Sequence, residues 1–159
     1  MQKSNSNPIN IGINDADREH IAQGLIHFLA KTYALYFKTH NFHWNVTGPQ
    51  FQTLHLLFEQ QYTELWMATD VIAERIRALG FFVPQNLLDT NTAFKGEVVP
   101  NATAMTAEIL AGHENLAKAV REILPAVESA KDIASADLLT QRLQLHEKTA
   151  WMLRSLIAS

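Results

Sequence analysis

Five side chains of the kinds that bind metal ions follow one another in the first half of this chain. They are His43, His55, Glu59, Asp70 and Glu74, and the last four fall in one predicted helix. On that helix His55 and Asp70 would be about 22 Å apart, because each residue adds about 1.5 Å. The ligands of one ion lie only about 2 Å from it. The set is therefore either two unrelated polar groups or one site that two copies of the chain complete.

The residue types indicate which metals could bind. Imidazole and carboxylate ligands suit iron, zinc and manganese. The chain contains no cysteine, which excludes disulfides and thiolate ligands and fits a reducing compartment. Histidines mixed with several carboxylates favour redox-active or di-metal iron chemistry over a closed structural zinc site. Zinc is a second candidate for the same ligands.

Hydrophobic residues recur with the period of a helix in four long segments, and no strand-like alternation persists anywhere. The length of 159 residues suits one domain, which we expect to span residues 14–159 after a mobile tail of residues 1–13. All five prolines lie outside the predicted helices, which cover about 14–45, 50–79, 102–124 and 131–157.

The connections predict how these helices are arranged. The short turn at Gly48-Pro49 makes the first two helices antiparallel neighbours. The connection over residues 81–100 is long enough to cross the bundle, and it could carry a short helix between Gln85 and Leu88. Four helices with one long connection is the plan of an all-α, ferritin-like four-helix bundle.

The predicted hairpin groups the five metal-binding side chains into two sets. His43 and His55 lie at nearly the same level, and Glu59 follows one turn later; we call these three residues the histidine half-site. Asp70 and Glu74 lie one turn apart and about four turns further along, and we call them the carboxylate half-site. Two copies packed antiparallel about a twofold axis near residues 62–66 would bring unlike half-sites together and form two identical sites.

Geometry alone leaves other interpretations open. His43 could be a hydrogen-bonded histidine near a helix end. Asp70 could pair with Arg75, and Glu74, which precedes two arginines within three residues, could belong to a solvated charged face. Trp66 lies on the same flank as both carboxylates, however, and a tryptophan outside the core favours a partner surface. The histidines at 20, 27, 40, 113 and 146 suit packed or partner-bonded roles better than metal binding.

The sequence over residues 41–75 resembles the Dps family, the "DNA-binding proteins from starved cells" or miniferritins. The resemblance rests on residues 41–48 (NFHWNVTG), on Phe51, His55 and Phe58-Glu59, and on residues 70–75 (DVIAER). The spacing H-x11-H-x3-E-x10-D-x3-E matches the family's pattern at every metal position. The length and the four-helix layout extend the match to the whole chain.

This resemblance implies a shell of twelve copies with ferroxidase sites at its twofold interfaces. His43 and His55 would come from one subunit and Asp70 and Glu74 from its neighbour, with Glu59 as a further acidic ligand. Trp44 matches a tryptophan beside that site, where it could be redox-active or simply packed. Proteins of this family oxidise Fe(II), usually with hydrogen peroxide in preference to oxygen, and store ferric mineral inside the shell.

The family also has an acidic iron channel at its threefold axes, near the start of the last helix. Asp132 and Asp137 fall at those positions, and Gln141 stands where a third acid can occur. The alternative is that both aspartates are ordinary acids at a helix N-terminus, where the helix dipole favours them.

DNA binding is expected to be weak or absent. The formal charge is −3, so twelve copies would carry −36 and repel phosphates. The predicted tail offers only Lys3 before Arg18, and the last residue is Ser159. No secretory signal and no membrane-spanning run is visible, so we expect a cytoplasmic protein that could associate with the nucleoid.

Two other functions compete with this interpretation. A ferritin or bacterioferritin would hold its di-iron centre inside each bundle with Glu-x-x-His motifs, and no glutamate of this chain has a histidine three residues later. A non-enzymatic stress shell, or a DNA-associated protein, could use the same ligands as a structural metal site. An enzyme should turn over added Fe(II), whereas a structural site should bind metal once and stop.

Overall fold

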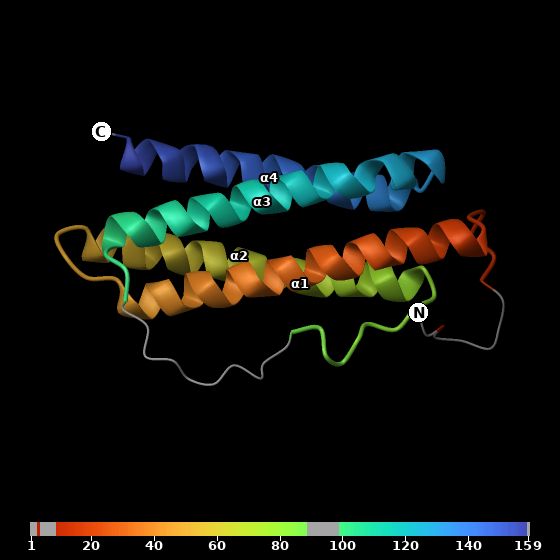
Figure 1. Ribbon diagram of the computed structural model, residues 1–159, viewed down its shortest axis with the longest axis horizontal. Helices are drawn as coiled ribbons and strands as arrows, with labels where there is room; N and C mark the ends of the chain where they lie inside the picture. The colour runs from red at the N-terminus through yellow and green to blue at the C-terminus, as the bar shows by residue number, and fades with distance from the viewer. Residues whose placement is uncertain (1–2, 4–8, 89–98, 159) are drawn as a thin grey trace.

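Four long helices form the described part of the molecule, a computed structural model that describes residues 3, 9–88 and 99–158. They are α1 (Asp15–Asn45), α2 (Phe51–Ala78), α3 (Ala102–Ser129) and α4 (Ile133–Ile157) (Figure 1). Among the described residues no strand forms, and an isolated bridge joins Lys3 to Phe81. The predicted all-α four-helix bundle is confirmed. Over the same residues, no helix is both long and apolar enough to cross a membrane.

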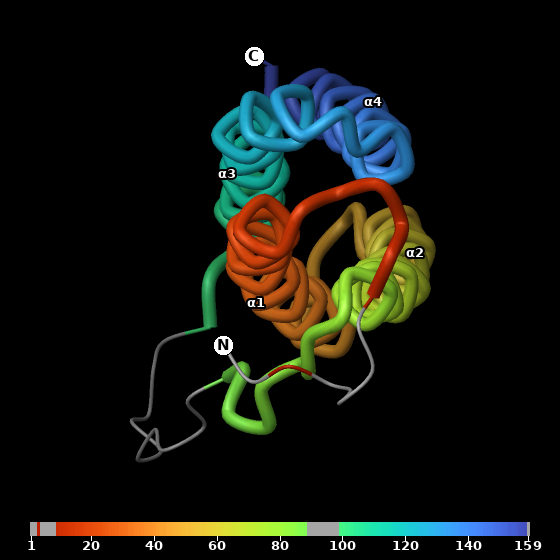
Figure 2. The backbone as a smooth tube through the Cα atoms, turned by 90° about the vertical axis from the view of Figure 1, so that its right-hand side faces the viewer, coloured from red at the N-terminus to blue at the C-terminus, as the bar shows by residue number. Residues whose placement is uncertain are grey.

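The helices pack as two antiparallel hairpins. α1 lies along α2, α3 lies along α4, and α1 also contacts α3. The view along the bundle shows the four helices around a common centre (Figure 2). α2 ends and α3 begins at opposite ends of the bundle (Figure 1). The positions of these two helix ends agree with the predicted crossover connection.

The prediction of a short helix between Gln85 and Leu88 is wrong. Gln85 and Asn86 form a turn, and Leu87 and Leu88 form a bend. Four residues could close very few helical hydrogen bonds, and the first turn of a helix is costly to form. Val83 and Leu87 instead pack against the core. Residues 89–98 of the connection lie outside the described residues.

Polar side chains and glycines set the helix ends. Asn14 Oδ1 accepts a hydrogen bond from the Asp17 N–H at 2.9 Å, and Asn101 Oδ1 accepts one from Ala104 at 2.9 Å. Such caps satisfy N–H groups that have no partner within the helix. Gly48, in the turn between α1 and α2, has φ +105°, a conformation that side-chain-bearing residues rarely adopt.

α3 continues through Pro125 to Ser129, so the predicted end of this helix at residue 124 is wrong. Pro125 lacks only the N–H that would bind the Arg121 carbonyl, and its ring is exposed at the outside of the helix. Val127, in the following turn, is completely buried. One lost hydrogen bond near the helix end is offset by the burial of this side chain.

Two described residues of the predicted tail contact the bundle. The Lys3 ammonium lies 2.7 Å from the carboxylate of Asp15, the first residue of α1, and a Cβ added to Gly80, just after α2, would meet Ile9 Cδ1 at 2.2 Å. Residues 1–2 and 4–8 lie outside the described residues, so the mobility of the tail stays a prediction.

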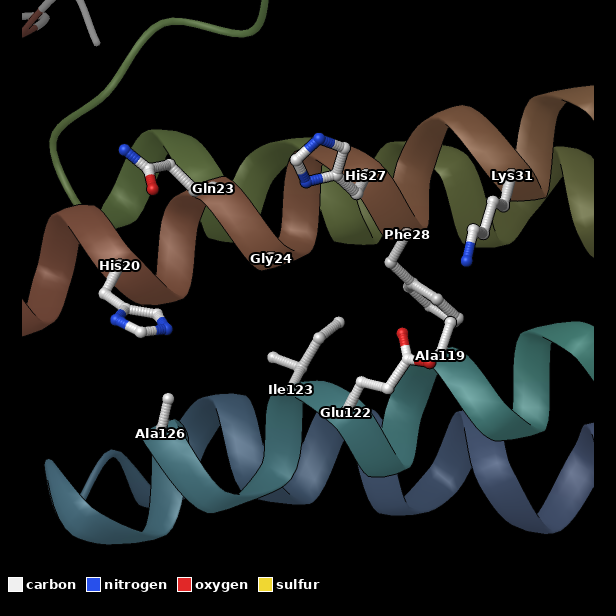
Figure 3. A pocket seen from close by; sticks show the side chains of 10 residues that line it. All are labelled: His20, Gln23, Gly24, His27, Phe28, Lys31, Ala119, Glu122, Ile123 and Ala126. Carbon is white, nitrogen blue, oxygen red and sulfur yellow. The ribbon is translucent and has the colours of Figure 1, made fainter.

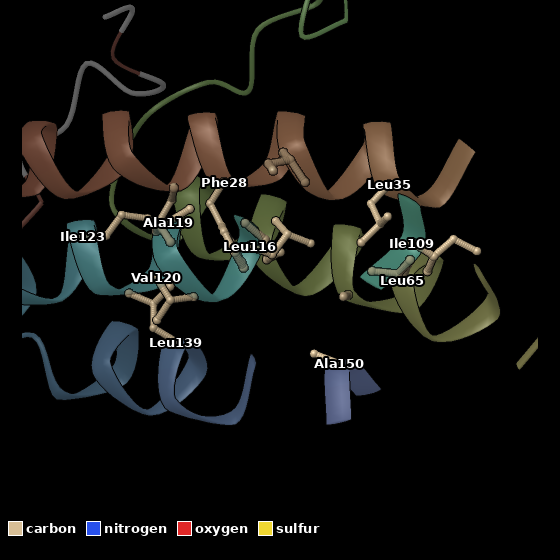
Figure 4. Close-up of a cluster of buried hydrophobic side chains, with 14 of the residues drawn as sticks. Phe28, Leu35, Leu65, Ile109, Leu116, Ala119, Val120, Ile123, Leu139 and Ala150 are labelled. Atoms are coloured by element: carbon tan, nitrogen blue, oxygen red, sulfur yellow. The ribbon is translucent and has the colours of Figure 1, made fainter. Parts of the chain in front are cut away.

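The core consists of large apolar side chains from all four helices (Figure 4). They lie on the helix faces that the hydrophobic periodicity of the sequence predicts to be buried. Each helix contributes completely buried members, which include Phe28, Phe58, Leu65, Ile72, Ile109, Val120, Leu139 and Leu153.

A polar network crosses this core between α2, α3 and α4. Glu64 forms an ion pair with Arg142, and Arg142 Nη2 lies 3.3 Å from His146 Nε2. Arginine can only donate, so His146 Nε2 accepts, and the proton of the neutral ring is on Nδ1. His146 Nδ1 then donates to His113 Nδ1, 3.0 Å away. The prediction that His113 and His146 are packed, partner-bonded histidines is confirmed.

Burial and the nearby Arg142 charge keep this histidine pair neutral. They lower the pKa of His113 to about 4 and that of His146 to about 2, with a further contribution from His113 in the second case. Both rings are almost inaccessible to solvent, with 1% and 0% exposed. A proton on either ring would place a second buried charge beside Arg142, which is costly.

We predict that the bundle loses stability as the pH falls below 6.5. The unfolded chain binds these two protons near pH 6.5 but the folded chain does not, so acidification favours unfolding. Each histidine should then cost roughly 2 kcal/mol of unfolding free energy between pH 6.5 and pH 5. Denaturant titrations at both pH values and one protein concentration measure this loss. The double variant H113L/H146L should show a flatter pH dependence, and an equal loss in that variant would assign the acid sensitivity to other groups.

Candidate metal centre

The histidine half-site lies at the closed end of the α1–α2 hairpin. His43 is in the last turn of α1 and His55 is in the second turn of α2. Their rings stack with centroids 3.8 Å apart and an interplanar angle of 20°. The prediction that these two imidazoles lie at the same level is confirmed.

Two reciprocal hydrogen bonds fix how these rings are oriented. His43 Nδ1 lies 2.8 Å from the His55 carbonyl oxygen, and His55 Nδ1 lies 2.9 Å from the His43 carbonyl oxygen. A carbonyl can only accept, so each Nδ1 carries the proton and each neutral ring presents a lone pair at Nε2. Metal-binding histidines commonly donate their other ring N–H to a carbonyl in this way. In both side chains Nε2 is therefore the ring atom that could bind a metal.

The carboxylate half-site lies far along α2 on an exposed face. Asp70 and Glu74 are one turn apart and both are exposed, as is Glu59 near the histidines. α2 runs as one helix from Phe51 to Ala78, so His55 and Asp70 stay about 22 Å apart along it. In the described part of the chain, no three His, Cys, Asp or Glu side chains come together as metal ligands. A single copy thus holds two separate half-sites.

The surface of α2 between the half-sites is unusually apolar for a solvent-facing helix. Its exposed large side chains are Leu56, Trp66, Met67 and Val71, each more than half exposed. Patches of this kind mark interaction surfaces, and aromatic residues and methionine are enriched at protein interfaces. The observation agrees with the partner surface that Trp66 predicts.

Trp44 contacts the histidine half-site indirectly, through His40. It is 57% exposed, and its ring centroid is 4.1 Å from that of His40. His40 stacks on Tyr62 at 4.0 Å, and Tyr62 meets His43 edge-on at 5.2 Å. Burial, and then the neighbouring His43, lower the pKa of His40. The sequence analysis missed this cluster, although the spacing of Tyr36, His40 and His43 on one helix could have indicated it.

The two aspartates expected in a channel differ in their surroundings. Asp132 is buried at the N-cap of α4, where its carboxylate accepts from Arg75 Nη2 at 2.6 Å, from Ser135 Oγ at 2.6 Å and from Ser135 N–H at 3.1 Å. Burial alone would raise the pKa of Asp132, but these hydrogen bonds and the Arg75 charge hold it below its usual value. Within one chain Asp132 is thus a helix cap, the alternative considered above. Asp137 is exposed and accepts from Gln141 Nε2 at 2.7 Å.

A groove of about 370 Å³ opens between α1 and α3, and no residue of either half-site lines it (Figure 3). His20, His27, Lys31 and Glu122 contribute polar side chains to it. It does not bring three metal-binding side chains together among the described residues. The α1–α2 hairpin therefore remains the candidate metal centre.

Comparisons with known sequences agree with the ferritin-like four-helix architecture. A family model described as a ferritin-like domain matches residues 22–159. An uncharacterised low temperature-induced protein of Nostoc is 39% identical over 155 residues, which cover 94% of this chain and 86% of the relative. DNA protection during starvation protein 2 of Bacillus anthracis is 35% identical over 126 residues, which cover 77% of this chain and 86% of the relative.

Solved structures have the same architecture. Dps from Thermosynechococcus elongatus superposes with a TM-score of 0.80 at 30% identity and covers 91% of this chain and 94% of its own. A Dps protein from Vibrio cholerae, described as a ferritin-like diiron-carboxylate protein, superposes with a TM-score of 0.84 at 26% identity, over 98% and 100% of the two chains. This chain belongs to the Dps family of ferritin-like proteins.

Proposed function

We propose that this chain is the subunit of a ferroxidase that oxidises Fe(II) between neighbouring copies and stores the ferric product in a closed homo-oligomeric shell of twelve. The observation that carries the proposal is the divided site. Two imidazoles present Nε2 lone pairs, yet among the described residues of one chain no three His, Asp or Glu side chains come together as metal ligands. Family membership supports iron as the metal, since a related structure carries the diiron-carboxylate description.

A twofold axis across α2 would complete the site. The midpoint between His55 and Glu74 falls between residues 64 and 65 of the helix, and so does the midpoint between Glu59 and Asp70. One axis at that level therefore places both carboxylates of the partner opposite the histidine half-site. Thr63 and Met67, both exposed, lie on either side of this level on the face that would pair. An isologous contact of this kind forms two sites per dimer.

The ligand types fit the proposed chemistry. The His43 and His55 Nε2 atoms would bind Fe(II), and the carboxylates of Glu59, Asp70 and Glu74 would favour the harder ferric product. Two Fe(II) ions in one site can deliver two electrons to hydrogen peroxide. The O–O bond then breaks to give two hydroxide ions, and no hydroxyl radical is released. Removal of free Fe(II) and peroxide would protect the cell and its DNA from oxidative damage.

The exposed Asp137 remains our candidate for the route by which Fe(II) enters the shell, while Asp132 is engaged with Arg75. We place the protein in the cytoplasm. Direct DNA binding should be weak at neutral pH and moderate salt, because the formal charge of the chain is −3. Clear retardation of DNA in a gel-shift experiment at low salt would contradict this part of the proposal.

Anaerobic addition of Fe(II), followed by hydrogen peroxide, tests the proposed activity. We expect about one peroxide to be consumed per two Fe(II), as two one-electron donors require, with the iron retained in a large particle. Zinc, which takes the same ligands but has no redox chemistry, should inhibit when added first. Metal binding that saturates without turnover would instead support the structural metal site.

Mixed shells test whether two chains share each site. His55→Ala and Asp70→Ala should each abolish most iron oxidation, because each removes a ligand from every site. In shells assembled from equal amounts of both variants, half of the dimers contain one of each. Each such dimer regains one intact site, so about one quarter of the wild-type activity should return. Separately assembled shells of the two variants, blended afterwards, are the control. No recovery in shells that contain both chains would exclude the shared site.

A further inference from the structure

The polar network in the core holds a cation among side chains of the kinds that bind metal ions. Arg142 Nη2 lies 3.1 Å from Glu64 Oε2 and 3.3 Å from His146 Nε2. One nitrogen atom of the guanidinium therefore meets a carboxylate oxygen from α2 and an imidazole lone pair from α4. Carboxylate oxygen and imidazole nitrogen are also ligands that iron, zinc and manganese accept. The proposed iron oxidation between copies uses none of these three residues.

The two buried histidines are arranged as they would be in a metal site. His146 donates from Nδ1 to His113 Nδ1, 3.0 Å away, and its Nε2 is left as an acceptor. Metal-binding histidines are commonly oriented in this way, by a hydrogen bond from the other ring nitrogen. Burial lowers the pKa of His146 to about 2, so the ring stays neutral in the folded chain. His146 could therefore bind a cation without first losing a proton.

The contacts around Arg142 do not satisfy its guanidinium completely. Arg142 Nε, Gln61 Oε1 and His113 Nε2 are buried and have no hydrogen-bond partner among the described residues. An unpartnered buried donor such as Arg142 Nε–H is costly. Gln61 lies one turn before Glu64 on α2 and is only 8% exposed. The surroundings of Arg142 thus favour a positive charge more strongly than they favour a guanidinium in particular.

We propose that Arg142 is a fixed internal cation that keeps Fe(II) out of the bundle core and thereby confines iron binding to the sites between copies. This inference rests on the proposed function and assigns to Arg142 the choice of where iron binds. A guanidinium stays charged and is covalently held, so it neutralises Glu64 permanently and occupies the His146 lone pair. With Arg142 in place, the described residues bring no three His, Cys, Asp or Glu side chains together as metal ligands. Without it, Glu64, whose side chain is 28% exposed, would be a partly buried carboxylate without its cation.

Cobalt titration of an Arg142→Met variant tests this inference. Methionine is uncharged and flexible, so it removes the cation and leaves Glu64 and His146 in place. The parent protein carries His55→Ala and Asp70→Ala, which make both half-sites incomplete. The Arg142→Met variant of this parent should bind about one more Co(II) per chain than the parent does, with the visible absorption bands of bound Co(II). Zn(II) should raise its unfolding temperature by several degrees, as a ligand that binds only the folded state does.

Glu64→Gln combined with Arg142→Met, in the same parent, is the matched control because it removes both charges of the ion pair. It should bind no additional Co(II) and gain no stability from Zn(II). A folded Arg142→Met variant that binds no more Co(II) than the parent would overturn the inference. An Arg142→Met variant that stays unfolded in the presence of Zn(II) would also overturn it, because a metal ion would then be unable to take the place of the guanidinium.

Iron oxidation by chains with intact half-sites separates this inference from the proposed function. With one Fe(II) per chain, Arg142→Met should oxidise about half as much iron in the rapid phase as the wild type, because two sites of similar affinity share the added iron. The double variant Glu64→Gln/Arg142→Met should match the wild type. An undiminished rapid phase in Arg142→Met would exclude a role for Arg142 in directing iron. No oxidation by the wild type would instead overturn the ferroxidase proposal and leave the cobalt result unaffected.

Discussion

The candidate metal centre depends on two hydrogen bonds that cross the α1–α2 hairpin. Each of His43 and His55 donates from Nδ1 to the backbone carbonyl of the other. The pair does three things at once: it joins the two helices near their turn, it sets the tautomer of both rings, and it leaves both Nε2 lone pairs free. Gly48 allows the tight turn, with φ +105°, that brings the two helix ends into this register. The two imidazoles are thus positioned by their contacts with the backbone.

α2 has two different environments on its two sides. Its inner side supplies Leu65 and Ile72 to the core and Glu64 to the buried network with Arg142. Its outer side carries the carboxylates and the exposed apolar residues between the half-sites. The dense inner packing keeps this helix in one piece over its whole length, and that rigidity fixes the separation of the half-sites. The same core that stabilises the bundle therefore prevents a single copy from closing a metal site on itself.

The sequence was sufficient for the features that depend on regular spacing. Helical periodicity located the four helices, and the spacing of His43 and His55 about the turn predicted that their rings lie at the same level. Predictions from local sequence rules failed where contacts in the folded bundle decided the outcome. Pro125 lies within a helix because Val127 beyond it is buried, and Asp132 is occupied by Arg75, which is distant in sequence. The aromatic cluster around His40 was missed because one of its members, Tyr62, lies on the other helix of the hairpin.

The separation of the half-sites along α2 also bears on the life of the newly made chain. Under the proposed function, a single folded copy would carry both parts of an iron site, but in places that cannot act on the same ion. Under the proposed function, a chain leaving the ribosome in an iron-containing cell would have no redox chemistry of its own. Assembly would then complete the iron-oxidation sites, and it would do so only where a closed shell is available to hold the ferric product.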